Sequence, residues 1–244
     1  MARFLPLLIL LCAPSVFPQS SSSILPEKET LDYSIEWRLI TAGKATLQFT
    51  GGHDPQVNLH VESIGLVSKL FKVLDAYSAS LNQSLCTQSI LLTSHEGRRS
   101  RETKVTYNSE THKADYLERD TAKDSVVLSK EIEIPACVHD VVGGLYYLRT
   151  LNIEPGHSIE IPVSDGKKSV MAKVDALQRE EVKTDAGTFK TVRYEIGLFN
   201  DVLYRRSAHL YVWLTDDHRK LPVQIRVRMQ FTIGTITLQL DKYE

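Results

Sequence analysis

The sequence predicts an all-β, mainly antiparallel fold: a strongly curved sheet, forming an open or half barrel, with one covering α-helix near residues 138–151. Two observations favour this class. Apolar and polar residues alternate along most of the chain, which is typical of strands with one dry and one wet face. Only two segments have helical spacing, so the long amphipathic strands have little to cover them. Such a sheet must close on itself or shelter something apolar.

The composition is that of an ordinary globular protein. Of the 244 residues, 42% are hydrophobic and 24% are charged, which excludes disordered, collagen-like and coiled-coil classes. The formal net charge, 29 − 30 = −1, provides no bulk attraction to nucleic acid. We expect one β-rich domain over residues 27–244, because the best candidate for a break, at 121–130, is weak.

Residues 1–19 are predicted to form a secretory signal peptide. Arg3 precedes an apolar run at 4–11, and small and serine-rich residues follow, so cleavage is expected between residues 15 and 20. A membrane anchor or a buried strand is the alternative, but the run is shorter than the roughly 20 residues that span a bilayer. The signal peptide predicts an exported protein of the periplasm or outer cell envelope.

The first strands are predicted by strict alternation. From Leu31 to Leu39 every odd position is apolar and every even position is polar. A turn follows at 41–44, and the alternation resumes over 45–49, so these two segments make a hairpin. The same pattern predicts further strands at 57–61, 73–81, 105–107, 114–116, 159–163, 170–174 and 192–198.

The end of the chain alternates most clearly, and the alternation changes phase at a glycine. From Val223 to Phe231 the odd positions are apolar, whereas beyond Gly234 the even positions are apolar, over 236–240. A one-residue phase change across a glycine predicts a β-bulge or a sharp bend in one long curved strand. A tight turn is the alternative.

Two segments have helical spacing. The longer, at 138–151, places Val141, Val142, Leu145 and Leu148 on one side, with Asp140 as the N-cap. Its two glycines, at 143 and 144, each weaken it by about 1 kcal/mol. A short helical turn is expected at 66–70.

Removal of the signal peptide leaves two cysteines, Cys86 and Cys137, in an oxidising compartment. A disulfide between them closes a loop of 137 − 86 = 51 residues, which stabilises a fold by about 4 kcal/mol in the chain-entropy model. The alternatives are two buried free thiols or one reactive thiol. Neither cysteine belongs to a CxxC motif, so the predicted role is structural.

The sequence contains no familiar catalytic or metal-binding motif. The eight histidines include no HExxH or His-x-His pair, and no GxSxG, P-loop or GxGxxG motif is present. The segment 215–220 is predicted to be a solvated loop, and the adjacent Glu180 and Glu181 lie on a polar stretch before a turn. We therefore predict no catalytic residue, no metal site and no cofactor.

One strand has apolar side chains on both faces. Leu210, Val212 and Leu214 are expected to face the main core, which leaves Tyr211 and Trp213 on the opposite face in need of a cover. That cover is the helix with Tyr146 and Tyr147, a neighbouring loop, or a bound ligand. We predict that Trp213 is largely buried. The candidate ligand contacts are Trp213, Tyr211, Tyr146 and Tyr147.

Arginines recur at 97–101, at 205–206, and at Arg226 and Arg228. The plain interpretation of these arginines is that they lie on a solvated face of the sheet. The functional interpretation is a platform for an anionic lipid or an envelope polymer, because guanidinium groups bind phosphate in a bidentate manner.

Several segments together resemble a known bacterial family, domain of unknown function 3108. They are 31–37 with 42–45, 72–77, 145–149 with 155–156 and 165–167, and 212–217 with 221–223 and 233–236. The resemblance spans nearly the whole mature chain and implies an exported, β-rich protein, and it brings no catalytic residues. The closing pattern, over the last third, is also similar to that of outer-membrane lipoprotein carriers, which are curved half-barrels that hold acyl chains on the concave face.

These observations lead to three functional hypotheses. The first is a non-enzymatic envelope protein that binds an apolar or lipid-like ligand on a curved β-sheet. The second is a structural or protein-interaction module with no small-molecule ligand, and the third is an enzyme with a diffuse active site. The expected partners are lipid or another envelope protein, with peripheral membrane contact and no nucleic acid.

Overall fold

The computed structural model describes residues 25–38, 40–230 and 234–244, so the predicted signal peptide lies outside the described residues. These residues form two helices and one antiparallel sheet of 14 strands. The helices are α1 (Gly65–Leu70) and α2 (Val141–Thr150). The strands are β1 (Lys28–Trp37), β2 (Ile40–Thr50), β3 (Gln56–Ser63), β4 (Val73–Leu81), β5 (Thr87–Glu96), β6 (Arg99–Asn108), β7 (Lys113–Asp120), β8 (Ser125–Glu133), β9 (Ser158–Ser164), β10 (Ser169–Thr184), β11 (Gly187–Ile196), β12 (Ala208–Thr215), β13 (Pro222–Met229) and β14 (Thr235–Tyr243).

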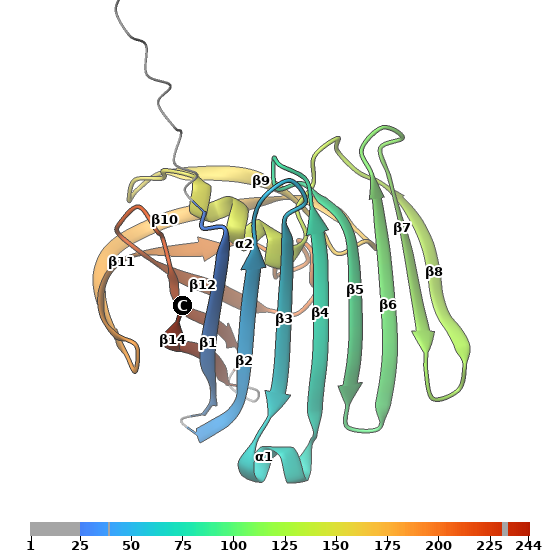
Figure 1. Ribbon diagram of the computed structural model, residues 1–244, viewed down its shortest axis with the longest axis horizontal. Helices are drawn as coiled ribbons and strands as arrows, with labels where there is room; N and C mark the ends of the chain where they lie inside the picture. The colour runs from blue at the N-terminus through green and yellow to red at the C-terminus, as the bar shows by residue number, and fades with distance from the viewer. Residues whose placement is uncertain (1–24, 39, 231–233) are drawn as a thin grey trace, which may run out of the picture.

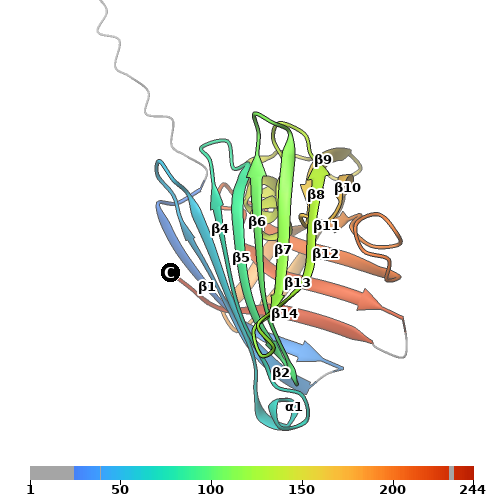
Figure 2. The same cartoon turned by 90° about the vertical axis from the view of Figure 1, so that its right-hand side faces the viewer.

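The sheet is built from two meanders that meet at the two ends of the chain. Its strand order is β8-β7-β6-β5-β4-β3-β2-β1-β14-β13-β12-β11-β10-β9, so β1 pairs with β14 and joins the halves. Figures 1 and 2 show the halves as two walls of a strongly curved sheet, with α2 between them near one end. The edge strands β8 and β9 do not pair with each other in the described chain, so the barrel stays open. The predicted fold class is confirmed.

Side chains hold the two walls together where the edges approach each other. The Tyr107 hydroxyl on β6 donates to the Ser164 carbonyl of β9 at 3.2 Å, and Lys130 Nζ on β8 donates to the Lys167 carbonyl at 2.7 Å. Gly166, in the β9–β10 turn, has φ +82°, and an added Cβ would lie 2.6 Å from the Val105 side chain. Only glycine therefore permits this turn to pack so closely against β6.

Helix α2 begins where its cap predicts. Asp140 is extended, and its Oδ1 accepts hydrogen bonds from the backbone N–H groups of Val142 and Gly143 at 2.8 and 3.0 Å. The helix starts later than residue 138 because His139, before the cap, forms a bridge with Val163 of β9. A glycine at 143 lets the backbone lie close to the Asp140 side chain, since an added Cβ would lie 2.5 Å from Asp140 Oδ2.

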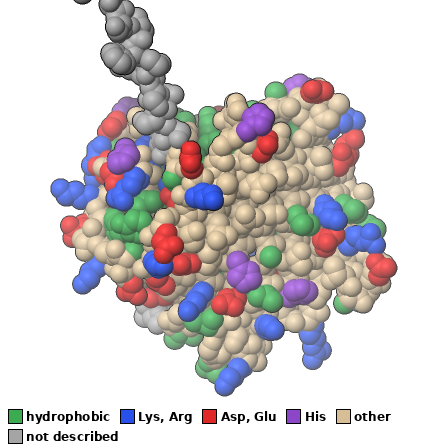
Figure 3. All heavy atoms as spheres, viewed as in Figure 1, with side chains coloured by type: hydrophobic (Ala, Val, Ile, Leu, Met, Phe, Trp, Pro, Cys, Tyr) green, Lys and Arg blue, Asp and Glu red, His purple; other side chains and the backbone are tan. Residues whose placement is uncertain are grey.

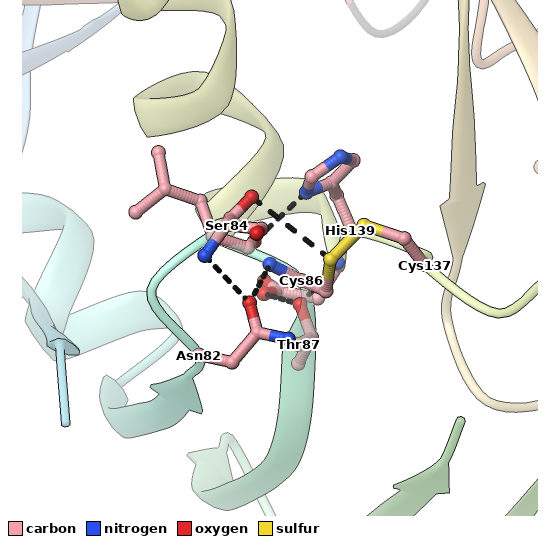
Figure 4. Close-up of a disulfide and its surroundings, with 8 residues drawn as sticks. Asn82, Ser84, Cys86, Thr87, Cys137 and His139 are labelled. Atoms are coloured by element: carbon pink, nitrogen blue, oxygen red, sulfur yellow. Dashed lines mark hydrogen bonds between the residues drawn. A yellow bond between two sulfur atoms is a disulfide. The ribbon is translucent and has the colours of Figure 1, made fainter. Parts of the chain in front are cut away.

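A disulfide joins Cys86 to Cys137, with a Cα–Cα distance of 5.1 Å (Figure 4). It links the segment after β4 to the segment that precedes α2. The surrounding turn is ordered by Asn82, whose side chain accepts from the N–H groups of Ser84 and Cys86 at 2.9 and 3.0 Å. The disulfide prediction is confirmed, and the alternatives of free or reactive thiols are excluded.

One sequence-based prediction is wrong in detail, and the alternative of a turn is the correct one. The phase change at Gly234 is a chain reversal, not a bulge in one long strand: β13 and β14 pair antiparallel, with Val227 opposite Ile236, and Gly234 has φ +89°. The segment 121–130, the weak candidate for a break, forms the β7–β8 turn and the first part of β8. β8 has little alternation because it is an edge strand, exposed along nearly its whole length. Leu39 and Phe231 lie outside the described residues.

The two helices differ in burial. α2 buries most of its length, including Leu145, Tyr146 and Leu148, whereas α1 has no buried residue. Neither of these helices is long and apolar enough to cross a membrane.

Candidate ligand cavity on the concave face

An apolar cavity of about 160 Å³ lies beneath α2, on the concave face of the sheet. The sheet contributes Leu47, Leu59, Val212 and Leu238, and the helix contributes Val142 and Leu145. The strands that line it belong to both walls, so the cavity exists only because the sheet curves around α2.

The register of the strands explains why the lining is aliphatic. Leu47 lies opposite Leu59 on the β2–β3 ladder, and Ile225 lies opposite both Val212 and Leu238 on the ladders of β12 to β14. Directly paired residues share one face of a sheet, so the alternation of each strand adds to a continuous apolar surface.

The cavity lining includes one polar side-chain atom, and it is already bonded. Among the lining residues only Tyr33 has a polar group on its side chain, and its hydroxyl donates to the Pro222 carbonyl at 2.7 Å. Burial raises the pKa of Tyr33 well above its usual value, so the phenol stays neutral. The lining therefore offers no charge or free hydrogen-bonding side chain to a ligand.

The packing around the cavity is incomplete. Leu59, Ile225 and Leu238 all point to the concave face, yet they remain partly exposed. Ile35 and Val61 continue the same face of β1 and β3 toward the end of the strands that carries α1, and they are also partly exposed (Figure 1). An aliphatic strip thus leads from the cavity toward that end.

A buried ion pair anchors the C-terminal half of the helical roof. Arg149 donates from Nη1 and Nη2 to the two carboxylate oxygens of Glu29 at 2.6 and 2.7 Å, and its side chain is 0% exposed. Nη2 also donates to the Arg219 carbonyl at 3.1 Å. The guanidinium lies 5.1 Å from the centre of the Tyr146 ring, which stacks on Phe49 with 4.5 Å between ring centroids. The pair ties α2 to β1.

Buried polar contacts anchor the N-terminal end of the roof. Asp140 accepts hydrogen bonds from the Tyr77 hydroxyl and, at 2.9 Å, from the Thr87 hydroxyl. Burial raises the pKa of Tyr77, and the carboxylate of Asp140 raises it further. His139 is buried, stacks on Tyr147 at 4.1 Å and lies 2.8 Å from the Leu85 carbonyl through Nδ1, and burial lowers its pKa. Since both ends are fixed, the roof is pre-organised over the cavity.

The four predicted ligand contacts fall into two groups on opposite faces of the sheet. Tyr146 and Tyr147 belong to the roof, where they pack against Phe49 and His139 and do not line the cavity. Trp213 and Tyr211 face away from it, on the convex side. Their role as ligand contacts stays a prediction.

The structure confirms that Trp213 is largely buried, with 4% exposure. Its cover is not α2, which lies on the other face of the sheet. The Arg226 guanidinium lies 5.1 Å from the ring centre, and Nε1 donates to Glu180 Oε1 at 2.6 Å. Trp213 and Tyr211 also line a convex hollow of about 280 Å³, together with Arg193, Arg226 and Arg228.

The alternation of apolar and polar residues places most cavity residues on the inward face of the sheet, but it does not predict the cavity. Leu59 and Leu238 have the same sequence pattern as fully packed neighbours such as Val57 and Leu240. The pattern gives the face of a side chain and contains no signal of what fills the space beyond it. No cluster of metal-ligating side chains occurs in the part of the chain that the structure describes.

A family model described as "protein of unknown function (DUF3108)" matches residues 32–241. The chain belongs to the DUF3108 family. The matched range contains every residue that lines the cavity, from Tyr33 to Leu238. Comparison of this DUF3108 chain with curated proteins finds no match.

One solved structure shows the same kind of fold, and others are more distantly similar. A β-barrel-like protein of the DUF1849 domain of unknown function from Brucella abortus is 8% identical, with a TM-score of 0.58, over 89% of this DUF3108 chain and 97% of its own. A protein from Bacteroides fragilis described as exported is 9% identical, with a TM-score of 0.34, over 90% and 97%. One from Parabacteroides distasonis described as a lipoprotein is 8% identical, with a TM-score of 0.35, over 91% and 98%. The first supports the open-barrel architecture.

Proposed function

We propose that this protein is exported to the cell envelope and there holds an apolar, lipid-like molecule in the cavity beneath α2. The observation that carries the proposal is an incompletely packed surface under a rigid roof, aliphatic apart from Tyr33, whose hydroxyl is already bonded. A natural core is packed to the density of an organic crystal, so a persistent void of this kind requires an explanation. A ligand that completes the packing provides one.

The size of the cavity limits what it holds. At about 160 Å³ it is smaller than the roughly 300–1,000 Å³ of sites that enclose a whole drug-sized ligand. An engineered apolar cavity of about 150 Å³ stays dry and binds benzene, so a hydrocarbon suits this space better than water does. We therefore propose that one segment of a single hydrocarbon chain occupies the cavity, and that the rest follows the strip past Val61 and Ile35.

A series of straight-chain fatty acids tests the proposal by isothermal titration of the purified mature protein. Each buried methylene contributes about 0.8 kcal/mol, so the dissociation constant should fall about fourfold with each added methylene until the apolar surface is filled. Lipid should also be found by mass spectrometry in organic extracts of the protein. The competing hypothesis, an interaction module without a ligand, requires that no fatty acid binds and that the extracts are empty; that result would reject our proposal.

Two matched variants distinguish the cavity from the rest of the surface. Leu59→Trp fills the cavity from β3, whereas His60→Trp places the same side chain on the exposed convex face one residue later. The first should abolish fatty-acid binding and the second should leave it unchanged. If Leu59→Trp does not fold, Ile225→Phe makes a smaller change in the same lining. Equal affinity in all variants would show that the chains bind elsewhere.

Export is tested at the N-terminus. Protein recovered from fractionated cells should lack the first 15 to 20 residues and should be found outside the cytoplasm, as determined by mass analysis of the intact chain. A cytoplasmic species that retains residues 1–15 would contradict the export.

A further inference from the structure

The end of the barrel that carries α1 exposes a group of large apolar side chains. Leu66 and Leu70 of α1, Phe71 directly after it and Ile40 at the start of β2 have exposures between 48% and 79%. Helix α1 packs against β2, and the Ile64 N–H before it donates to the Ala42 carbonyl of β2 at 2.9 Å. These four residues, which we name the apolar tip, therefore belong to one protruding end of the molecule (Figure 1).

Local packing does not explain the apolar tip. A short surface helix normally turns its leucines toward the core, but no residue of α1 is buried. Helix α1 also protrudes beyond the ends of the strands (Figures 1 and 2). Monomeric proteins rarely expose such groups together unless they contact a partner or a membrane.

Basic side chains surround the apolar tip. Lys69 and Lys72 lie in and just after α1, and Arg98 and Arg99 lie in and just after the β5–β6 turn; all four are exposed. The turn touches the tip, because the Phe71 ring would lie 2.8 Å from a Cβ added to Gly97, and the Gly97 N–H donates to the Lys72 carbonyl at 2.7 Å. Figure 3 shows apolar and basic groups together at this end.

The charge of this end favours an anionic partner. None of these four basic side chains forms an ion pair with another described residue. Residues 62–72 and 96–99, which include the two connections and the strand ends beside them, contain two acidic residues, Glu62 and Glu96, so their balance is 4 − 2 = +2, against −1 for the whole chain. Long basic side chains can extend their charge to lipid phosphates while neighbouring apolar groups enter the interface.

We propose that the apolar tip and its four basic neighbours dock the protein on an anionic lipid surface. A protruding apolar point with unpaired positive charge around it is suited to a bilayer interface, into which Leu66, Leu70 and Phe71 insert. The docked orientation brings the strip of Ile35 and Val61 toward the lipid. Docking does not depend on a bound ligand in the cavity, so the two proposals can fail separately.

The test is flotation of the purified mature protein with vesicles of phosphatidylcholine, with and without phosphatidylglycerol. The protein should bind only the vesicles that contain phosphatidylglycerol, and less at high salt. Since each basic residue near an anionic surface contributes about 1 kcal/mol, Arg98→Ser/Arg99→Ser should bind about thirtyfold more weakly. Leu70→Glu should abolish binding.

Control variants make comparable changes elsewhere on the surface. Met171→Glu alters an exposed apolar side chain of β10, and Lys173→Ser/Lys183→Ser removes two exposed charges from the same strand. These variants should bind like the unaltered protein, and Leu70→Glu should keep its fatty-acid affinity in the absence of vesicles. The proposal would be overturned if the unaltered protein did not bind phosphatidylglycerol vesicles, or if tip and control variants lost binding equally. A protein would then be the partner of the tip.

Discussion

The buried ion pair between Glu29 and Arg149 should be one of the most sensitive points of the fold. Glu29→Gln keeps the shape of the side chain and removes its charge, which leaves the guanidinium of Arg149 buried, at 0% exposure, without a counter-ion. One amide oxygen replaces two carboxylate oxygens, and the Arg219 carbonyl remains as a further acceptor.

The expected loss follows from this geometry. Removal of one partner of a buried pair costs about 3–5 kcal/mol, because the remaining charge stays out of water. For a chain of this length, that corresponds to a decrease of about 6–20 °C in the melting temperature. We expect the free energy of unfolding, measured by urea denaturation, to show the same loss.

Two further variants make the measurement decisive. Glu27→Gln makes the same change at an exposed position two residues earlier, and it should cost less than about 0.5 kcal/mol. Replacement of both partners, as Glu29→Leu/Arg149→Met, should recover much of the stability, because a paired apolar replacement leaves no buried charge. A loss below about 1 kcal/mol for Glu29→Gln, equal to that of Glu27→Gln, would refute the argument that this pair anchors α2.

Three other predictions concern the disulfide, a buried histidine and the convex tryptophan. Cys86→Ser/Cys137→Ser should lose about 4 kcal/mol of unfolding free energy in urea, and an unchanged midpoint under oxidising conditions would contradict the role of the bond. Burial lowers the pKa of His139 below its ordinary value of about 6.5, so the unfolded chain binds the proton more readily and the free energy of unfolding should fall as the pH decreases below about 6.5. The His139→Gln variant should lack that part of the pH dependence. If its stability varied with pH as that of the unaltered protein does, the assignment to His139 would be wrong. In a Trp37→Phe variant, Trp213 should fluoresce at short wavelength as a buried indole does, and emission like that of free tryptophan would show that it is exposed.

The sequence by itself determined those features that depend on neighbouring residues. The alternation of β1 and β13 identifies a strand and its dry face because side chains point to opposite faces at a period of two. Asp140 identifies the start of α2 because its cap bonds reach only two and three residues along the chain. The even number of cysteines left after the predicted signal peptide favoured a Cys86–Cys137 pair, with free or reactive thiols as the alternatives.

Only the tertiary structure decided how distant segments meet. The pairing of β1 with β14 and the contact of Glu29 with Arg149, 120 residues apart, depend on strand order, which the alternation of a single strand does not contain. The same reason explains why Trp213 was correctly placed on a second face while its cover was not identified: Arg226 and Glu180 come from other strands. The cavity and the exposed α1 are likewise outcomes of curvature. Whether Leu59 or Leu70 is packed depends on which elements the curved sheet brings opposite its side chain. The local sequence pattern does not contain that information.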